Sequence, residues 1–191
     1  MFKRKKLQLF ALLLAIIAIT ALSPATAFGA AAHSKGVILV LDGIKGESRD
    51  AAIKDGIDIL SVSFGASLQV SAVGGGGGGK AGKASFSDVS LMKYLDAASL
   101  PLLKNLAMGK AIKDGTLYFF DGRSDKPYLS IAMKNILVTS QQTSGSGEEK
   151  LTESISLNYA QAMFTYNVFG PDGRVESTST LNVDIEKNVF N

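Results

Sequence analysis

Two long stretches of the sequence alternate apolar and other side chains with a period of two, and each shifts phase once. In residues 128–139 the apolar positions carry odd numbers up to Met133 and even numbers from Ile136. In residues 151–168 they are odd up to Tyr159 and even from Ala162. Since neighbouring side chains of a strand point to opposite faces, such a shift indicates a β-bulge or a strand that turns to serve another face. Long strands of this kind predict a barrel or a strongly bent sandwich.

The remaining pattern is also that of strands separated by turns. Shorter apolar or alternating runs predict strands over 37–41, 57–70, 84–94 and 116–120. One helix is expected, with Ser99 as its cap, Pro101 in its first turn and Gly109 just after its end. The residues therefore predict a mostly β fold, a barrel or a strongly bent sandwich, with one short flanking α-helix.

The N-terminal segment 1–27 has the features of a cleaved signal peptide. A basic start, 3–6, precedes the apolar run 7–22, and Ala25-Thr26-Ala27 is a small-x-small cleavage signal. The apolar run is shorter than the roughly 20 residues that a membrane span needs, so an uncleaved anchor is the lesser alternative. We expect an exported protein, secreted or periplasmic, with a single domain over 28–191 and no membrane association after cleavage.

Cleavage also changes the charge. Loss of the four basic residues 3–6 takes Lys+Arg from 20 to 16 against 17 Asp+Glu, so the net charge falls from +3 to −1. The mature domain therefore gives no electrostatic case for a nucleic-acid partner. The sequence has no cysteine, so stability must come from packing and assembly and not from disulfides.

A run of six glycines, Gly74, Gly75, Gly76, Gly77, Gly78 and Gly79, is followed by Lys80. A phosphate-binding loop would need Ser or Thr after the lysine and a helix behind it, but Ala81 and a strand-like stretch follow. The run is therefore interpreted as a pliable loop between strands, which a partner must order.

Few residues of the sequence could support catalysis. His33 is the only histidine, so a metal site or a catalytic triad would have no second histidine and no cysteine. The acids Glu148, Glu149 and Glu153 could in principle support hydrolysis. We expect no enzyme activity, no cofactor and no metal; an exported hydrolase that uses Glu148 or Glu149 stays open as an alternative.

Several motifs together resemble the Hcp family, the tube proteins of type VI secretion. They are Asp42-Gly-Ile-Lys-Gly-Glu-Ser48, Ser63-Phe-Gly65, the glycine run, Lys93-Tyr-Leu-Asp96, Ser144-Gly-Ser-Gly-Glu-Glu-Lys-Leu-Thr-Glu153 and Ser156-Leu-Asn-Tyr-Ala-Gln161. They cover nearly the whole mature chain in order, whereas residues 166–191 are only loosely similar to the family.

The resemblance implies a small β-barrel with one short flanking α-helix. It also implies a homohexameric ring that stacks with other rings into a tube, beneath a spike protein and inside a sheath, with effector cargo in the lumen. It implies that Gly74–Gly79 form a contact loop between subunits or rings, and it makes Ser63 a candidate lumen-facing residue. From alternation alone, Ser63 fits any solvated strand face equally well.

Residues 1–27 depart from the family pattern, because such tubes are assembled in the cytoplasm without a signal peptide. Either the protein is an exported paralogue or its start site is misassigned. An exported monomeric binding module that reuses the barrel is the alternative function.

Overall fold

The computed structural model describes residues 36–50, 52–71 and 80–191. Residues 31–191 form one compact unit. The expected signal peptide, residues 1–27, and the predicted boundary after it lie outside the described residues, as does His33. Across the described residues, no helix combines the length and apolar character that crossing a membrane requires.

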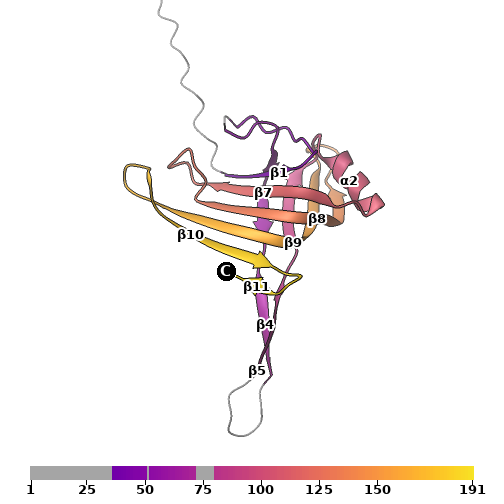
Figure 1. The fold of residues 1–191 in the computed structure, drawn as a ribbon. Helices are drawn as coiled ribbons and strands as arrows, with labels where there is room; N and C mark the ends of the chain where they lie inside the picture. The colour runs from indigo at the N-terminus through magenta and orange to yellow at the C-terminus, as the bar shows by residue number, and fades with distance from the viewer. Residues whose placement is uncertain (1–35, 51, 72–79) are drawn as a thin grey trace, which may run out of the picture. The chain divides into compact units, whose positions relative to one another are not determined.

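Eleven strands and one helix make up this part of the chain (Figure 1). In order they are β1 (Gly36–Leu41), β2 (Ile57–Ile59), β3 (Ser61–Ser63), β4 (Ala66–Ser71), β5 (Lys80–Phe86), β6 (Val89–Tyr94), α2 (Ser99–Met108), β7 (Ile112–Phe120), β8 (Leu129–Ser144), β9 (Thr152–Phe169), β10 (Val175–Asp184) and β11 (Val189–Phe190). The prediction of a mostly β fold with one short helix is confirmed.

Nine of the strands form one antiparallel sheet. Its path runs β11-β10-β9-β8-β7-β1-β2, and β6 pairs with both β9 and β3. The two ends of the sheet meet at Leu60, which is the single residue between β2 and β3 and donates its N–H to the Met92 carbonyl at 2.7 Å. β2 pairs with β1 and β3 pairs with β6, and the sheet curls around the core between these two edges.

The phase shift in the two longest strands has a local cause. Asn135 in β8 has a φ of 52°, in the left-handed region, and the Asn135–Ala160 pair is missing from the β8–β9 ladder, whose register also shifts between Val138 and Ser140. The Ala160 carbonyl instead accepts a hydrogen bond from the backbone N–H of Ile185 at 3.0 Å. A left-handed residue interrupts the pleat, so Met133 and Ile136 can both point inward although they are three residues apart. The predicted irregularity is confirmed.

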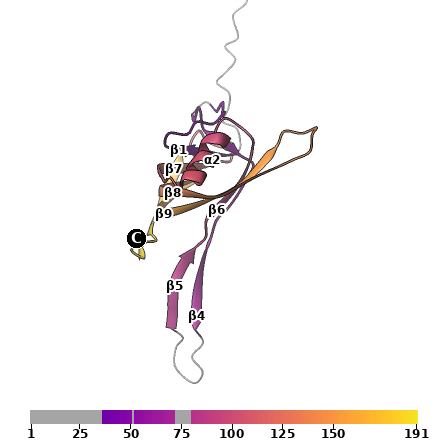
Figure 2. The ribbon, with the colours of Figure 1, turned by 90° about the vertical axis from the view of Figure 1, so that its right-hand side faces the viewer.

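The core lies inside the curled sheet and is closed on one side by α2, which lies beside β8 in both ribbon views (Figures 1 and 2). Most inward positions of the curl are aliphatic, and α2 contributes one buried apolar side chain, Leu102. The least exposed core side chains are Ile57, Leu117, Ile136 and Leu157.

The helix ends as predicted but begins differently. Gly109 has a φ of 59°, and the N–H groups of Gly109 and Lys110 bond the carbonyls of Leu106 and Asn105, which is a Schellman ending. The expectation that Ser99 caps the helix is wrong. Ser99 is the first helical residue, and its hydroxyl is used by buried side chains of the sheet instead.

The strands that flank the glycine run form a separate two-stranded sheet. β4 and β5 pair from Ala66↔Phe86 to Ser71↔Lys80, side by side in Figure 2. The run itself, Gly74–Gly79, lies outside the described residues. Phe64 and Gly65 separate β3 from β4.

Candidate functional site

A lysine is buried at the end of β6, and it organises a polar cluster inside the fold. The Lys93 side chain is 1 % exposed, and its Nζ lies 2.8 Å from Glu153 Oε2 and 2.6 Å from Asp96 Oδ1. The ammonium also donates to Ser99 Oγ at 2.9 Å and to the Tyr94 carbonyl at 2.8 Å. We name Lys93, Asp96, Ser99, Gln141 and Glu153 the buried cluster.

The second charge of the cluster, Glu153, comes from β9 and is also 1 % exposed. Its Oε2 accepts from the Ser99 hydroxyl at 2.6 Å, and its Oε1 accepts from Gln141 Nε2 and the Thr143 hydroxyl. Burial acts to raise the pKa of Glu153, but hydrogen bonds from Lys93, Ser99 and Gln141 and the Lys93 charge outweigh it, so this pKa lies below its ordinary value. Both carboxylate oxygens are therefore occupied by protein donors.

The cluster joins three parts of the chain. Gln141 Nε2 also donates to the Ser99 carbonyl at 3.0 Å, and Asp96 Oδ1 accepts from the Ala98 N–H at the start of α2. The first turn of α2 is thereby tied to β6, β8 and β9. β8 is longer than the alternating stretch 128–139 from which it was predicted. It continues to Ser144, and Gln141 and Thr143 in this extension face Glu153.

Sequence reasoning missed this cluster, although a signal was present. Lys93 stands in phase with Val89 and Leu91, and Glu153 in phase with Ile155 and Leu157. Period-two alternation therefore places both charges on the inward face. An inward Lys and an inward Glu on neighbouring strands predict a buried ion pair.

The glycine-loop hairpin, defined as β4 and β5, has a different character. In β4 every described side chain is exposed, including Leu68 and Val70, which is 63 % exposed. An isolated two-stranded hairpin is marginally stable in water. The described hairpin forms no ladder with the nine-stranded sheet and touches it through the Phe86 ring of β5, which stacks on Phe190 of β11 with 5.7 Å between the ring centroids. Its exposed apolar side chains offer a surface for contact with another molecule.

Ser63 lies on β3, the strand next to this hairpin. It is exposed and pairs with Ser90 of β6. Ser61 of the same strand is exposed as well, whereas Val62 between them is half-buried. The structure thus places Ser63 on a solvated strand face and does not bring it together with the buried cluster.

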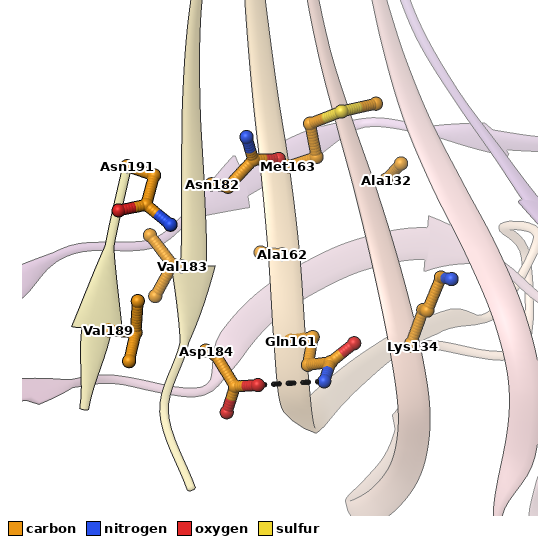
Figure 3. A pocket seen from close by; sticks show the side chains of 10 residues that line it. All are labelled: Ala132, Lys134, Gln161, Ala162, Met163, Asn182, Val183, Asp184, Val189 and Asn191. Carbon is orange, nitrogen blue, oxygen red and sulfur yellow. Dashed lines mark hydrogen bonds between the residues drawn. The ribbon is translucent and has the colours of Figure 1, made fainter. Parts of the chain in front are cut away.

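A pocket of about 360 Å³ lies where β8, β9, β10 and β11 run side by side (Figure 3). Met163 and Ala132 line one part of it, and the Gln161 amide donates to Asp184 Oδ2 at 2.9 Å at another. Lys134 is exposed at its rim. Among the described residues, no group of His, Cys, Asp or Glu side chains could hold a metal ion.

The acids considered for hydrolysis are divided by the fold. Glu148 and Glu149 are exposed in the turn between β8 and β9, whereas Glu153 is held in the buried cluster. Within the described part of the chain, no side-chain hydrogen bond or ion pair joins the exposed pair to a nucleophile or to a general acid. The arrangement offers surfaces for binding and gives hydrolysis no support.

The fold defines a class, a β-rich domain with one short helix and an exposed two-stranded hairpin. The family model described as "Type VI secretion system effector, Hcp" matches residues 38–166. The chain belongs to the Hcp family of type VI secretion, the family that its motifs indicate, and it is an Hcp-like tube protein. Residues 167–191, which include β10 and β11, lie beyond the matched region.

Individual relatives agree with this assignment. The protein hcp1 of Pseudomonas aeruginosa is 37 % identical over 133 residues, which are 68 % of this chain and 82 % of that protein. The crystal structure of Hcp1 from Salmonella typhimurium is 28 % identical, with a TM-score of 0.68, over 81 % of this chain and 97 % of that one. A solved type six secretion system protein is similar in fold, with a TM-score of 0.77 and 23 % identity, over 83 % of this chain and 100 % of that one.

Proposed function

We propose that this tube protein assembles into homohexameric rings and that these rings stack into a tube. It acts by assembly and not by catalysis, and it uses no cofactor. The glycine-loop hairpin carries this proposal, since Leu68 and Val70 are exposed apolar side chains on β4, a strand that pairs with β5 and with no strand of the nine-stranded sheet. A partner subunit that covers this hairpin removes apolar surface from water and fixes the loop at Gly74–Gly79.

The size of the purified segment 28–191 tests the proposal. We expect six-fold rings in negative-stain micrographs and a hexameric mass by light scattering. A strictly monomeric protein at high concentration would contradict it, and would favour the monomeric binding module.

Substitutions in the hairpin test which surface makes the contact. Leu68→Ser together with Val70→Ser should weaken ring stacking and leave the far-ultraviolet circular dichroism and the urea midpoint of the domain unchanged, because neither side chain is in the core. Ser67→Ala, on the same strand, is the matched control and should stack like the wild type. If the double variant unfolds instead, the hairpin packs inside the domain and the assignment is wrong.

In the assembled ring we place Ser63 at the lumen, where effector cargo would travel. A Ser63→Cys variant labelled with a bulky maleimide should narrow the central channel in averaged images of the ring. Label density on the outer wall of the ring would contradict this placement. Spike and sheath proteins are the further partners that a stacked tube implies.

We also propose that the protein is exported by residues 1–27 and reaches a secreted or periplasmic location. The secreted character agrees with the family, whereas the export route rests on the sequence of the segment. N-terminal sequencing of protein recovered from culture fractions should find the chain starting at Phe28. A chain that starts at Met1, or at a methionine encoded elsewhere, would contradict cleavage.

A further inference from the structure

A groove of about 450 Å³ runs between α2 and the turn that follows β1. Pro101, Met108 and Ala111 give it an apolar lining, and Met108 is 64 % exposed. The turn contributes Asp42, Gly43 and the buried side chain of Ile44. We name this feature the lysine groove, because Lys104, Lys110 and Lys113 also line it.

The charge of the groove differs from that of the domain. The mature chain is close to neutral, yet the segment 97–113 holds three lysines and no acid. Asp42 is the one acid among the lining residues. The lining of the groove therefore carries more positive than negative charge, with three lysines against one aspartate.

The lysines are also available. Within the described part of the chain, Lys104 and Lys110 have no ion-pair partner, and Lys113 lies 3.7 Å from Asp114 with both side chains largely exposed. An exposed pair of that kind is worth little. A cation near a helix C-terminus does favour the helix dipole, but this explains Lys110 alone and not the exposed Met108 beside it.

We propose that the lysine groove binds an acidic, amphipathic segment of a partner protein. One apolar side chain of that segment would fill the space beside Met108 and Pro101, and flanking carboxylates would meet Lys104 and Lys110. A concave groove between a helix and a turn suits a peptide segment better than a flat bilayer, which could reach the outer helix residues Leu100 and Leu103 but not the groove floor.

A peptide selection tests this without knowledge of the natural partner. The full assembled protein is used to select from a displayed library of random peptides, and the double variant Lys104→Glu/Lys110→Glu is used for counter-selection. We expect enriched peptides that combine Asp or Glu with Leu or an aromatic residue. A synthetic copy of an enriched peptide should bind the double variant at least about tenfold more weakly than it binds the wild type. The Met108→Asp variant should not bind it. Its affinity for the wild type should fall with added salt.

Lys134→Glu is the control, because Lys134 is an exposed lysine on β8 outside the groove, and it should bind the peptide like the wild type. All variants must keep the wild-type circular dichroism and ring size. The proposal is overturned if the enriched peptides are neutral or basic, or if no selected peptide distinguishes the double variant. Binding to phosphatidylglycerol vesicles without peptide binding would overturn it in favour of a membrane. Loss of rings in the double variant without peptide binding would assign the groove to a second copy.

Discussion

Removal of the buried ammonium, by Lys93→Met, is the perturbation that tests the structure most directly. Methionine keeps most of the volume of the lysine side chain. It leaves Glu153, whose side chain is 1 % exposed, without its cation. Loss of one partner of a buried ion pair costs about 3–5 kcal/mol. Hydrogen bonds from Ser99 and Gln141 remain, but they come from neutral donors.

The variant can escape part of this cost if Glu153 takes up a proton. From an ordinary pKa of about 4.3, protonation at pH 7 costs about 3.7 kcal/mol, at 1.36 kcal/mol for each pH unit. At pH 5 the same step costs only about 1 kcal/mol. We therefore expect Lys93→Met to lower the free energy of unfolding by about 3–4 kcal/mol at pH 7 and by markedly less at pH 5.

Urea unfolding followed by circular dichroism at fixed protein concentration measures this difference. Lys134→Met, an exposed lysine on β8, is the matched control and should change stability by less than about 0.5 kcal/mol. The double variant Lys93→Met/Glu153→Gln should recover part of the loss, because it also removes the charge of Glu153 and leaves only Asp96 without its cation. A loss below about 1 kcal/mol at pH 7, or one of equal size at both pH values, would refute the buried cluster as described.

Three further outcomes are expected. In the wild type, the lowered pKa of Glu153 means that its contribution to stability is present above its unfolded pKa and is lost as the pH falls through the lower folded value; Glu153→Gln should therefore flatten the acid limb of a stability–pH curve. Gly46→Ala should lower the free energy of unfolding by about 3 kcal/mol in urea, because a Cβ there would overlap the Gly56 carbonyl oxygen; an unchanged midpoint would contradict the pairing of these segments. Asn135→Val should cost about 1–2 kcal/mol by thermal unfolding, whereas Asn135→Gly should be close to neutral, because the position has a φ of 52°; equal effects would exclude the left-handed conformation.

Sequence reasoning succeeded where local chemistry decides the outcome. Turn residues and alternation placed most of the strands, and Gly109 was enough for the end of the helix. The predicted run 57–70 divides into β2, β3 and β4, the run 84–94 is divided between β5 and β6, and β10 and β11 were not predicted. The odd-to-even phase shift located the irregularity at Asn135 to within a few residues.

It failed where a contact between distant segments decides. Serine is a common residue at the N-cap of a helix, but the Ser99 hydroxyl donates its hydrogen bond to Glu153, 54 residues away in the sequence. Alternation also could not predict how the sheet curls, because it shows on which face of a strand each side chain lies and not which strands pair. For the assembly surfaces, the resemblance to the Hcp family pointed to Ser63 and to Gly74–Gly79. Ser63 is exposed, and its placement at the lumen stays a prediction; the glycine run lies outside the described residues.

The buried cluster and the lysine groove are linked through α2. Ser99 at the start of the helix is held by Lys93, Glu153 and Gln141, and Leu102 one turn later is fully buried. A helix fixed at its first turn and stopped by a left-handed residue at its end has little freedom to rotate about its axis. The direction in which Lys104 and Met108 face is therefore set by charges on the opposite side of the same helix. If the groove binds as proposed, Lys93→Met should weaken peptide binding at pH 7 although Lys93 never touches the peptide, and rescue by Lys93→Met/Glu153→Gln would show that the cluster acts by positioning α2.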